Sequence, residues 1–219
     1  MTPVRELFPL VVVDVALFTV EHESLRVLLV KRAQEPEAKR WALPGGVLKP
    51  DLDDSLEAAA RRVLRTKVSV DIPHVEEVCT FSGATRDPRG WSVAVLFYAL
   101  LPRDKVNELV RSKIEAVKWA VATETGHRLA FDHDSQLNAA LRTLQAKVEG
   151  QTLPLHLLPE KFTITELQLT CEAITGSPLD KGTFRRRLKN SRELVPIDEY
   201  IRGAQRPAQL FMASDSFRF

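Results

Sequence analysis

The stretch that decides the fold is GGVLKPDLDDSLEAAARRVLRTKVSV, residues 45–70. A glycine pair and an acidic loop precede residues 54–67, where apolar side chains recur on one helical face and Asp54 or Ser55 can cap the helix. This order is typical of scaffolds that cleave diphosphates with Mg²⁺. Such sites need several carboxylates on the helix, yet this helix carries arginines and a lysine. The stretch therefore predicts either a catalyst with unusual ligands or a scaffold without catalysis.

The flanking patterns predict a mixed sheet. Two β-rich runs, 11–20 and 25–32, enclose a polar turn, and a second pair, 74–84 and 91–101, encloses the turn TRDPRG. A short strand follows at 117–123 and a helix at 134–148. We expect an α/β fold of the α+β type, in which helices pack against a mixed sheet.

Composition and length are typical of a globular protein of one or two domains. The chain has 219 residues, of which 44% are hydrophobic and 27% charged. No apolar tract is long enough to span a bilayer, and no signal peptide is recognisable, so we expect a cytoplasmic protein without a membrane partner. Cys79 and Cys171 lie far apart without zinc-ligand spacing, which predicts reduced cysteines and no metal site.

The pattern changes at GQTLPLHLLP, residues 150–159, which resembles a hinge with two prolines. We therefore expect two domains, 1–150 and 151–219. In the second domain Thr163 and Glu166 form a capping box, Gly176 suits a helix end, and Asp180 can cap a second helix over 181–191. Two apolar runs, LVPI and QLFMA, then flank a polar tip. Two short helices followed by a hairpin predict a C-terminal winged helix-turn-helix domain.

The basic residues are concentrated in this second domain. Residues 181–206 hold 8 Lys and Arg against 3 Asp and Glu, although the whole chain has a net charge of only +2. If Phe184 and Leu188 face inward, the cations of the second helix face outward. The predicted contacts with double-stranded operator DNA are Lys181, Thr183, Arg185, Arg186, Lys189 and Asn190 on the helix, and Arg202 and Arg206 at the hairpin tip. The alternatives are a solvated charged face or a docking face for an acidic protein.

Residues 45–70 resemble the signature of the Nudix family, G-x5-E-x7-R-E-U-x-E-E-x-G-U, in which U is aliphatic. Gly46 and Arg62 match its glycine and arginine, and Asp54 falls at its first glutamate in a loop two residues longer. The metal-binding glutamates of the family fall at Val63, Thr66 and Lys67. We therefore predict a Nudix-like fold with no catalytic and no metal-binding residues. The alternative is a divergent Mg²⁺-dependent pyrophosphatase for ADP-ribose or nucleoside-diphosphate sugars, with loop and helix acids as replacement ligands.

The whole chain resembles the Nudix-related transcriptional regulators of bacterial NAD metabolism. The likeness rests on KR at 31–32, WALPGG at 41–46, LAFDH at 129–133, LDKGTFRRRL at 179–188 and RGAQRPAQLF at 202–211. The resemblance implies a homodimeric repressor of NAD biosynthesis or salvage genes. It also implies that ADP-ribose is an effector ligand and that no cofactor is needed.

Six residues are candidates for the ligand pocket: Arg32, Trp41, Gly45, Gly46, Asp132 and His133. Arg32 could pair with a diphosphate, and the two glycines let the backbone approach a phosphate, although a tight turn explains them equally well. Asp132 and His133 lie between a strand and a helix, where polar residues often meet ligands. Core packing is the alternative for Trp41, and hydrogen bonding at the helix start is the alternative for His133.

Overall fold

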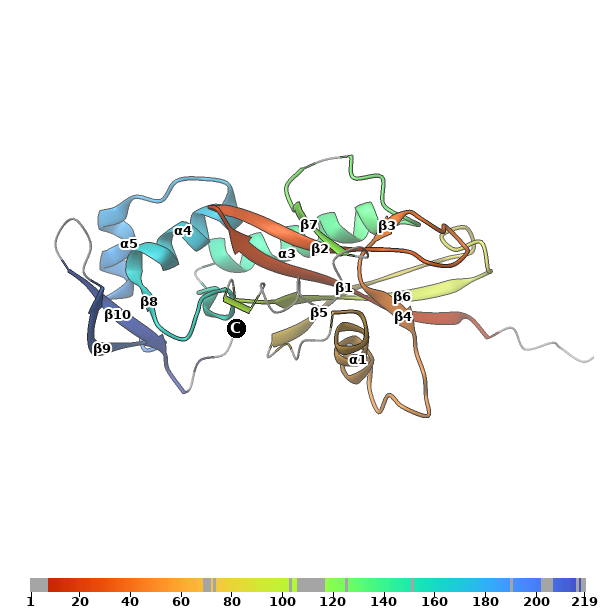
Figure 1. Ribbon diagram of the computed structural model, residues 1–219, viewed down its shortest axis with the longest axis horizontal. Helices are drawn as coiled ribbons and strands as arrows, with labels where there is room; N and C mark the ends of the chain where they lie inside the picture. The colour runs from red at the N-terminus through yellow and green to blue at the C-terminus, as the bar shows by residue number, and fades with distance from the viewer. Residues whose placement is uncertain are drawn as a thin grey trace, which may run out of the picture.

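The computed structural model describes residues 8–68, 72, 74–102, 104–105, 117–124, 126–150, 152–189, 191–201, 207–215 and 217. The molecule is elongated (Figure 1), with a large sheet and two flanking helices at one end and a small helical unit with its own sheet at the other. The element order matches the predicted sequence of strands, helix, strands, helix and winged helix.

The large sheet has seven strands, with β1 at its centre. The strands are β1 (Leu10–Glu21), β2 (Ser24–Lys31), β3 (Trp41–Ala42), β4 (Gly45–Val47), β5 (His74–Gly83), β6 (Ser92–Leu100) and β7 (Val117–Val121). The main order is β3-β2-β1-β6-β5, while β4 pairs with β1 and β7 with β2. In the described part of this sheet, β1 and β6 run parallel and the other pairs are antiparallel. The predicted mixed sheet is confirmed.

Both faces of this sheet are covered by helices, because β1 is apolar on both sides. Val13, Val15 and Leu17 contribute to the core under α1 (Leu56–Val68), whereas Ala16 and Phe18 belong to the core under α3 (His133–Glu149). A strand buried on both faces appears in sequence as a nearly continuous apolar run. This burial explains the run at 11–18.

The helix α1 begins two residues later than predicted. Of the two candidate caps, Ser55 is used: its Oγ accepts a hydrogen bond from the Ala58 N–H at 3.0 Å. The helix then presents Ala60, Val63 and Leu64 to the core.

The C-terminal unit is a winged helix, as predicted. It comprises the 3₁₀ turn η1 (Leu155–Leu157), β8 (Phe162–Thr163), α4 (Ile164–Thr175), α5 (Lys181–Leu188), β9 (Leu194–Ile201) and β10 (Ala208–Ala213), with sheet order β8-β10-β9. The capping box of Thr163, the left-handed Gly176 and the cap by Asp180 are all present. Two boundaries were wrong: α5 ends three residues early, and residues 198–201 continue β9 instead of forming the tip.

Residues 152–159 of the segment that resembled a hinge are packed. Leu153, Leu155, Leu157 and Leu158 are buried in the same apolar cluster as the inner faces of α3 and α4. The two units therefore share one core. None of the helices in the described part of the chain is long and apolar enough to cross a membrane.

Candidate ligand cavity and nucleic-acid interface

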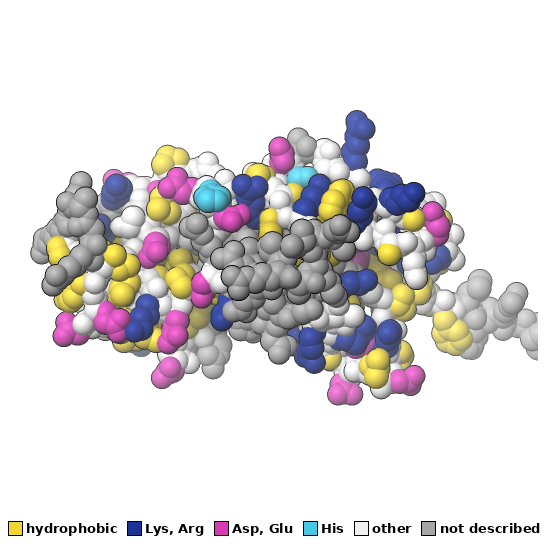
Figure 2. Space-filling model, viewed as in Figure 1, with side chains coloured by type: hydrophobic (Ala, Val, Ile, Leu, Met, Phe, Trp, Pro, Cys, Tyr) yellow, Lys and Arg dark blue, Asp and Glu magenta, His cyan; other side chains and the backbone are white. Residues whose placement is uncertain are grey.

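A cavity of about 540 Å³ is lined by the start of β1, the end of β2, β4 and the loop between β5 and β6. Figure 1 shows these segments in the part of the molecule away from the winged helix. Four of the six predicted pocket residues line it: Arg32, Gly45, Gly46 and His133. Its wall carries five cations (Lys31, Arg32, Lys67, Arg86 and Arg89) and three acids (Asp14, Glu35 and Asp87). This excess of positive charge favours an anionic ligand. Figure 2 shows Lys and Arg side chains gathered on the same half of the molecule.

Asp14 contributes a carboxylate to the cavity wall, and its position explains why residue 45 is a glycine. Gly45 pairs with Asp14 across β4 and β1. A Cβ atom at Gly45 would lie 2.1 Å from Asp14 Oδ1, so no larger residue fits beside this carboxylate. Asp14 is only 4% exposed. A single acid inside an apolar strand was the sequence signal for this residue, and we missed it.

Arg32 has a guanidinium group available to a ligand. Its Nε donates to the Pro36 carbonyl at 2.9 Å, and the guanidinium carbon lies 4.6 Å from the centre of the Phe131 ring. Burial lowers the pKa of Arg32, and the nearby charge of Arg89 lowers it further. Its two terminal nitrogens donate no hydrogen bond within the described part of the chain. They can therefore bind an anion without breaking another contact.

The β5–β6 loop supplies three further charged residues that sequence reasoning treated only as a turn. Arg86 forms a two-pronged contact with Asp132, at 2.9 and 2.8 Å, and also donates to Ser92. Arg89 similarly holds Asp87, at 3.0 and 2.6 Å. Burial opposes ionisation of Asp132, but its hydrogen bonds from Arg86 and Gln136 outweigh burial and hold its pKa below the ordinary value. Both acids therefore stay ionised beside their arginines.

Asp132 and Trp41, two of the predicted pocket residues, do not line the cavity. The carboxylate of Asp132 is engaged with Arg86 and Gln136. Trp41 packs against the main core, and the Lys118 ammonium lies 4.5 Å from its ring centre. The structure thus favours the core alternative for Trp41.

His133 lines the cavity but is almost wholly buried. Its Nδ1 accepts a hydrogen bond from the Leu43 N–H at 3.0 Å, and its Nε2 lies 3.6 Å from Asp14 Oδ2. Burial lowers its pKa, against the opposing effect of Asp14. We infer a neutral ring with its proton on Nε2, facing Asp14. The ring therefore links the start of α3 to the turn before Gly45, as the hydrogen-bonding alternative required.

Arg62, which matches the signature arginine, pairs with Asp53, the residue before Asp54, at 2.6 and 2.7 Å. The hydrogen bond from Arg62 is the main cause that lowers the pKa of Asp53 to about 2. Both oxygens of Asp53 are occupied, because Oδ2 also accepts from the Lys49 N–H. Asp53 therefore holds the acidic loop against α1.

The three positions of the signature glutamates lie beside the cavity. Val63 is 2% exposed, and its Cγ2 would touch a Cβ at Gly46 at 3.0 Å. Thr66 and Lys67 line the cavity wall. Among the residues that the structure describes, no group of three or more His, Cys, Asp or Glu side chains is arranged to hold a metal ion.

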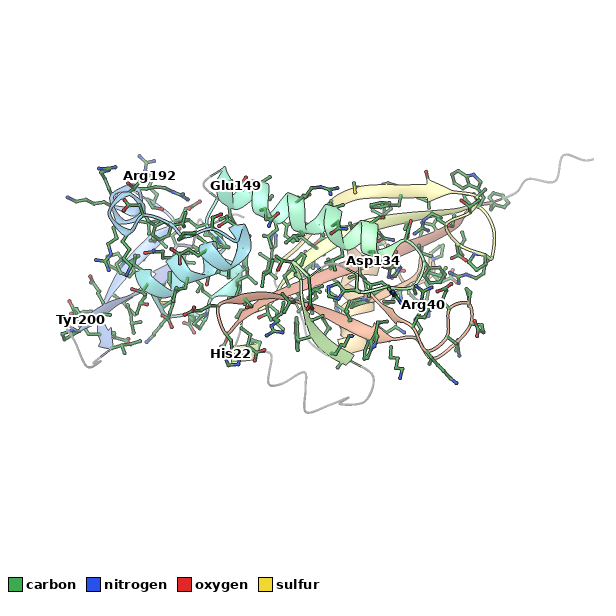
Figure 3. The ribbon with its side chains drawn as sticks, turned by 90° about the horizontal axis from the view of Figure 1, so that it is seen from above. His22, Arg40, Asp134, Glu149, Arg192 and Tyr200 are labelled. Carbon is green, nitrogen blue, oxygen red and sulfur yellow. The ribbon has the colours of Figure 1, made fainter. Side chains whose placement is uncertain are left out.

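A second concave surface, the α5–wing groove, lies between α5 and the β9–β10 hairpin. Arg185, Arg186 and Lys189 line it from the helix, and Pro196, Tyr200 and Phe211 line it from the wing. Phe184 and Leu188 are buried, so the cationic face points outward as predicted. In Figure 3, Arg192 and Tyr200 mark this end of the molecule, far from Arg40.

Five of the eight predicted DNA contacts lie on described residues. Lys181, Thr183, Arg185, Arg186 and Lys189 are all exposed. Arg186 also donates to the Thr183 hydroxyl at 3.4 Å, which orders two of these side chains. Asn190, Arg202 and Arg206 lie outside the described residues.

Two family models match the chain. The NUDIX domain matches residues 9–142, and the NrtR DNA-binding winged helix domain matches residues 154–213. Neither range overlaps the segment 143–153, which contains the end of α3.

Relatives and solved structures match both units. The chain is 40% identical to an ADPR responsive transcriptional repressor NtrR of Acinetobacter baylyi, over 93% of this chain and 81% of that protein. The crystal structure of Shewanella oneidensis NrtR complexed with a 27mer DNA has a TM-score of 0.85 and 34% identity, over 93% of each chain. The NUDIX domain of that NrtR, crystallised with ADP ribose, has a TM-score of 0.56 and 34% identity, over 66% of this chain and 94% of that domain.

Proposed function

Because the chain belongs to the NUDIX family, in the group that carries an NrtR DNA-binding winged helix domain, we propose that it is a bacterial transcriptional repressor responsive to ADP-ribose. Its targets are genes of NAD biosynthesis or salvage. As a DNA-binding regulator it acts in the cytoplasm, where bacterial DNA lies.

The exposed cationic face of α5 is the observation that carries this proposal. Arg185, Arg186 and Lys189 form no ion pair within the described part of the chain, and they line a groove whose other wall is the wing. Cations left without acidic partners keep their attraction for phosphates. Thr183 and Arg186 lie about one turn apart on α5 and are hydrogen-bonded to each other, which suits hydrogen bonding to base edges in the major groove.

The cavity in the NUDIX domain is the sensing site. Its volume of about 540 Å³ suits a nucleotide-sized ligand, and its cationic excess suits a diphosphate. We assign the diphosphate to the free terminal nitrogens of Arg32, and the backbone at Gly45 and Gly46 permits close approach. ADP-ribose is then an effector, not a cofactor.

The same domain binds the diphosphate without cleaving it. Metal-assisted hydrolysis requires carboxylates that converge on hard cations. At the positions where the signature places them, Val63 is apolar and buried, and Lys67 adds a positive charge that repels Mg²⁺. Asp53 of the acidic loop is occupied by Arg62.

We further propose a homodimer that reads a palindromic operator, because two copies of α5 related by a twofold axis contact two half-sites. Light scattering at the concentrations used for DNA binding measures the number of chains. A monomer bound to a single half-site would contradict this part of the proposal.

The function is tested by a gel shift on promoters of NAD-metabolism genes at a stated salt concentration. The wild-type protein is expected to bind such a fragment specifically and to be released by ADP-ribose. The variant Arg185→Ala with Arg186→Ala is expected to lose binding. The matched control, Arg65→Ala with Arg142→Ala, removes the same charge from exposed positions of α1 and α3 and is expected to retain binding.

Two outcomes would contradict the proposal. Equal loss of binding in both double variants would show a general charge effect and no specific role for α5. Mg²⁺-dependent release of AMP from ADP-ribose by the wild-type protein would show an active hydrolase. Calorimetry with ADP-ribose, NAD and phosphorylated relatives identifies the effector.

A further inference from the structure

Helix α3 connects the ligand cavity with the winged helix. Figure 3 shows its start, marked by Asp134, near Arg40 at the cavity end, and its last residue, Glu149, beside the C-terminal unit. Side chains at both ends of the helix form hydrogen bonds to groups outside it. A straight helix of this kind moves as one body, because its backbone is hydrogen-bonded throughout.

At the cavity end, the first turn of α3 is held by residues of the cavity wall. Gln136 is fully buried, and its Nε2 donates both to Asp14 at 3.1 Å and to Asp132 at 2.9 Å. Asp132 also receives two hydrogen bonds from Arg86. Asp14 and Arg86 line the cavity. Gln136 Oε1 is buried without a hydrogen-bond partner in the described part of the chain, so this cluster is not saturated.

At the other end, α3 holds the winged helix. Gln145 Nε2 donates to the Ile174 carbonyl, near the end of α4, at 3.0 Å. The inner faces of α3 and α4 also belong to one apolar cluster.

From α4 the contacts continue to the DNA-reading helix. Gln168 and Glu172 of α4 hold the backbone of Leu179, at 3.1 and 2.8 Å. The next residue, Asp180, caps α5. A displacement of α4 therefore reaches the helix that lines the α5–wing groove.

We propose that α3 transmits occupation of the cavity to α5, through Gln136 in its first turn and Gln145 nearer its other end. This inference rests on the proposed function and adds the route of the response. An anion in the cavity attracts Arg86, which must then share its guanidinium between the ligand and Asp132. The first turn of α3 shifts, and Gln145 carries the shift to α4. ADP-ribose and operator DNA thus favour different positions of one rigid element.

The variant Gln145→Met tests this route, because it removes the donor, keeps the length of the side chain and lies outside both binding surfaces. Operator affinity is measured with and without saturating ADP-ribose, and the ratio of the two affinities is the coupling. The matched control is Asn138→Leu, which replaces an exposed amide on the same helix. We expect Gln145→Met to keep the operator affinity measured without ADP-ribose and the ADP-ribose affinity measured without DNA. The ratio of operator affinities with and without ADP-ribose should fall by about fivefold, the effect of one net hydrogen bond. Asn138→Leu keeps the wild-type ratio.

The outcomes of this experiment distinguish the role of α3 from the proposed function of the protein. If ADP-ribose changes operator binding in the wild type and in Gln145→Met to the same extent, the role of α3 is refuted and the proposed function stands. If ADP-ribose does not change operator binding of the wild type, the proposed function itself fails. If the variant melts at a lower temperature, hydrogen exchange separates lost coupling from lost stability. We expect ADP-ribose to change the exchange rates of the α5 amides in the wild type and not in the variant. An equal response in both would overturn the proposal.

Discussion

The contact between Gly45 and Asp14 predicts a strong coupling between two substitutions. In Gly45→Ala, the new Cβ would lie 2.1 Å from Asp14 Oδ1 and 3.2 Å from Asp14 Cγ, so the carboxylate must move. Overpacking of this kind costs about 1–3 kcal/mol. The movement also deprives Gln136 of an acceptor, and a buried donor that loses its partner costs about 1–3 kcal/mol. We expect Gly45→Ala to lower the free energy of unfolding by about 2–6 kcal/mol.

Removing Asp14 first should relieve most of this penalty. Asp14→Ala eliminates both atoms of the clash and leaves the Val13 carbonyl, at 3.3 Å, as the remaining close contact. The double variant is therefore expected to be about as stable as Asp14→Ala alone. The coupling energy then approaches the penalty of Gly45→Ala, which is at least about 2 kcal/mol.

Thermal unfolding followed by tryptophan fluorescence measures this cycle. All three tryptophans, residues 41, 91 and 119, lie in the NUDIX domain, so the signal reports the unit that contains the contact. A change of 1 kcal/mol corresponds to about 2–4 °C for a protein of this size. Additivity of the two substitutions within about 0.5 kcal/mol would refute the geometry at Gly45.

Three further predictions concern pH, domain independence and salt. Burial and the charge of His156 lower the pKa of His74 to about 4, so its contribution to stability is present above about pH 6.5 and is lost as pH falls toward 4. This pKa shift corresponds to a loss of at most about 3 kcal/mol in the free energy of unfolding, and of about half that after solvent screening. Urea midpoints at pH 7.5 and 5 measure the loss, which should be larger in the wild type than in His74→Phe. Phe184→Ala removes a buried ring of α5 and is expected to cost the winged helix about 3–5 kcal/mol; DNA binding should fall while calorimetry still detects ADP-ribose. For Lys189→Gln, the slope of log K against log salt is expected to become shallower by about 1.8, because the proposed dimer loses one phosphate contact, worth about 0.9, in each subunit; an unchanged slope would show that Lys189 contacts no phosphate.

Much of the fold could be predicted because its signals are local. The strand pairs, α1, α3 and the two capped helices of the winged helix depend on residues within a few positions of each other, and the structure has all of them. The outward face of α5 followed from the spacing of Phe184 and Leu188 alone. The boundaries were less predictable, because the end of β9 depends on its pairing with β10, where Ile201 faces Ala208.

The cavity could be predicted only in part, because its walls come from distant segments. Arg32 and the two glycines could be predicted because they belong to recognisable motifs. Arg86 and Arg89 belong to a turn in the sequence, and only the folded position of the β5–β6 loop places them at the cavity. The choice of Asp53 over Asp54 as the partner of Arg62 likewise depends on how the acidic loop packs on α1.

The sequence by itself determined that α1 carries valine, threonine and lysine where a metal site needs glutamates, and that the basic residues gather on one short helix, because composition and periodicity are properties of the chain. Only the tertiary structure decided how these two regions are joined. Gln136 is hydrogen-bonded to Asp14, 122 positions away in the sequence, and the leucines of residues 152–159 join the apolar cluster that contains the inner faces of α3 and α4. Hydrogen bonds and apolar contacts over such separations form when the sheet and helices pack, so no local pattern reveals them.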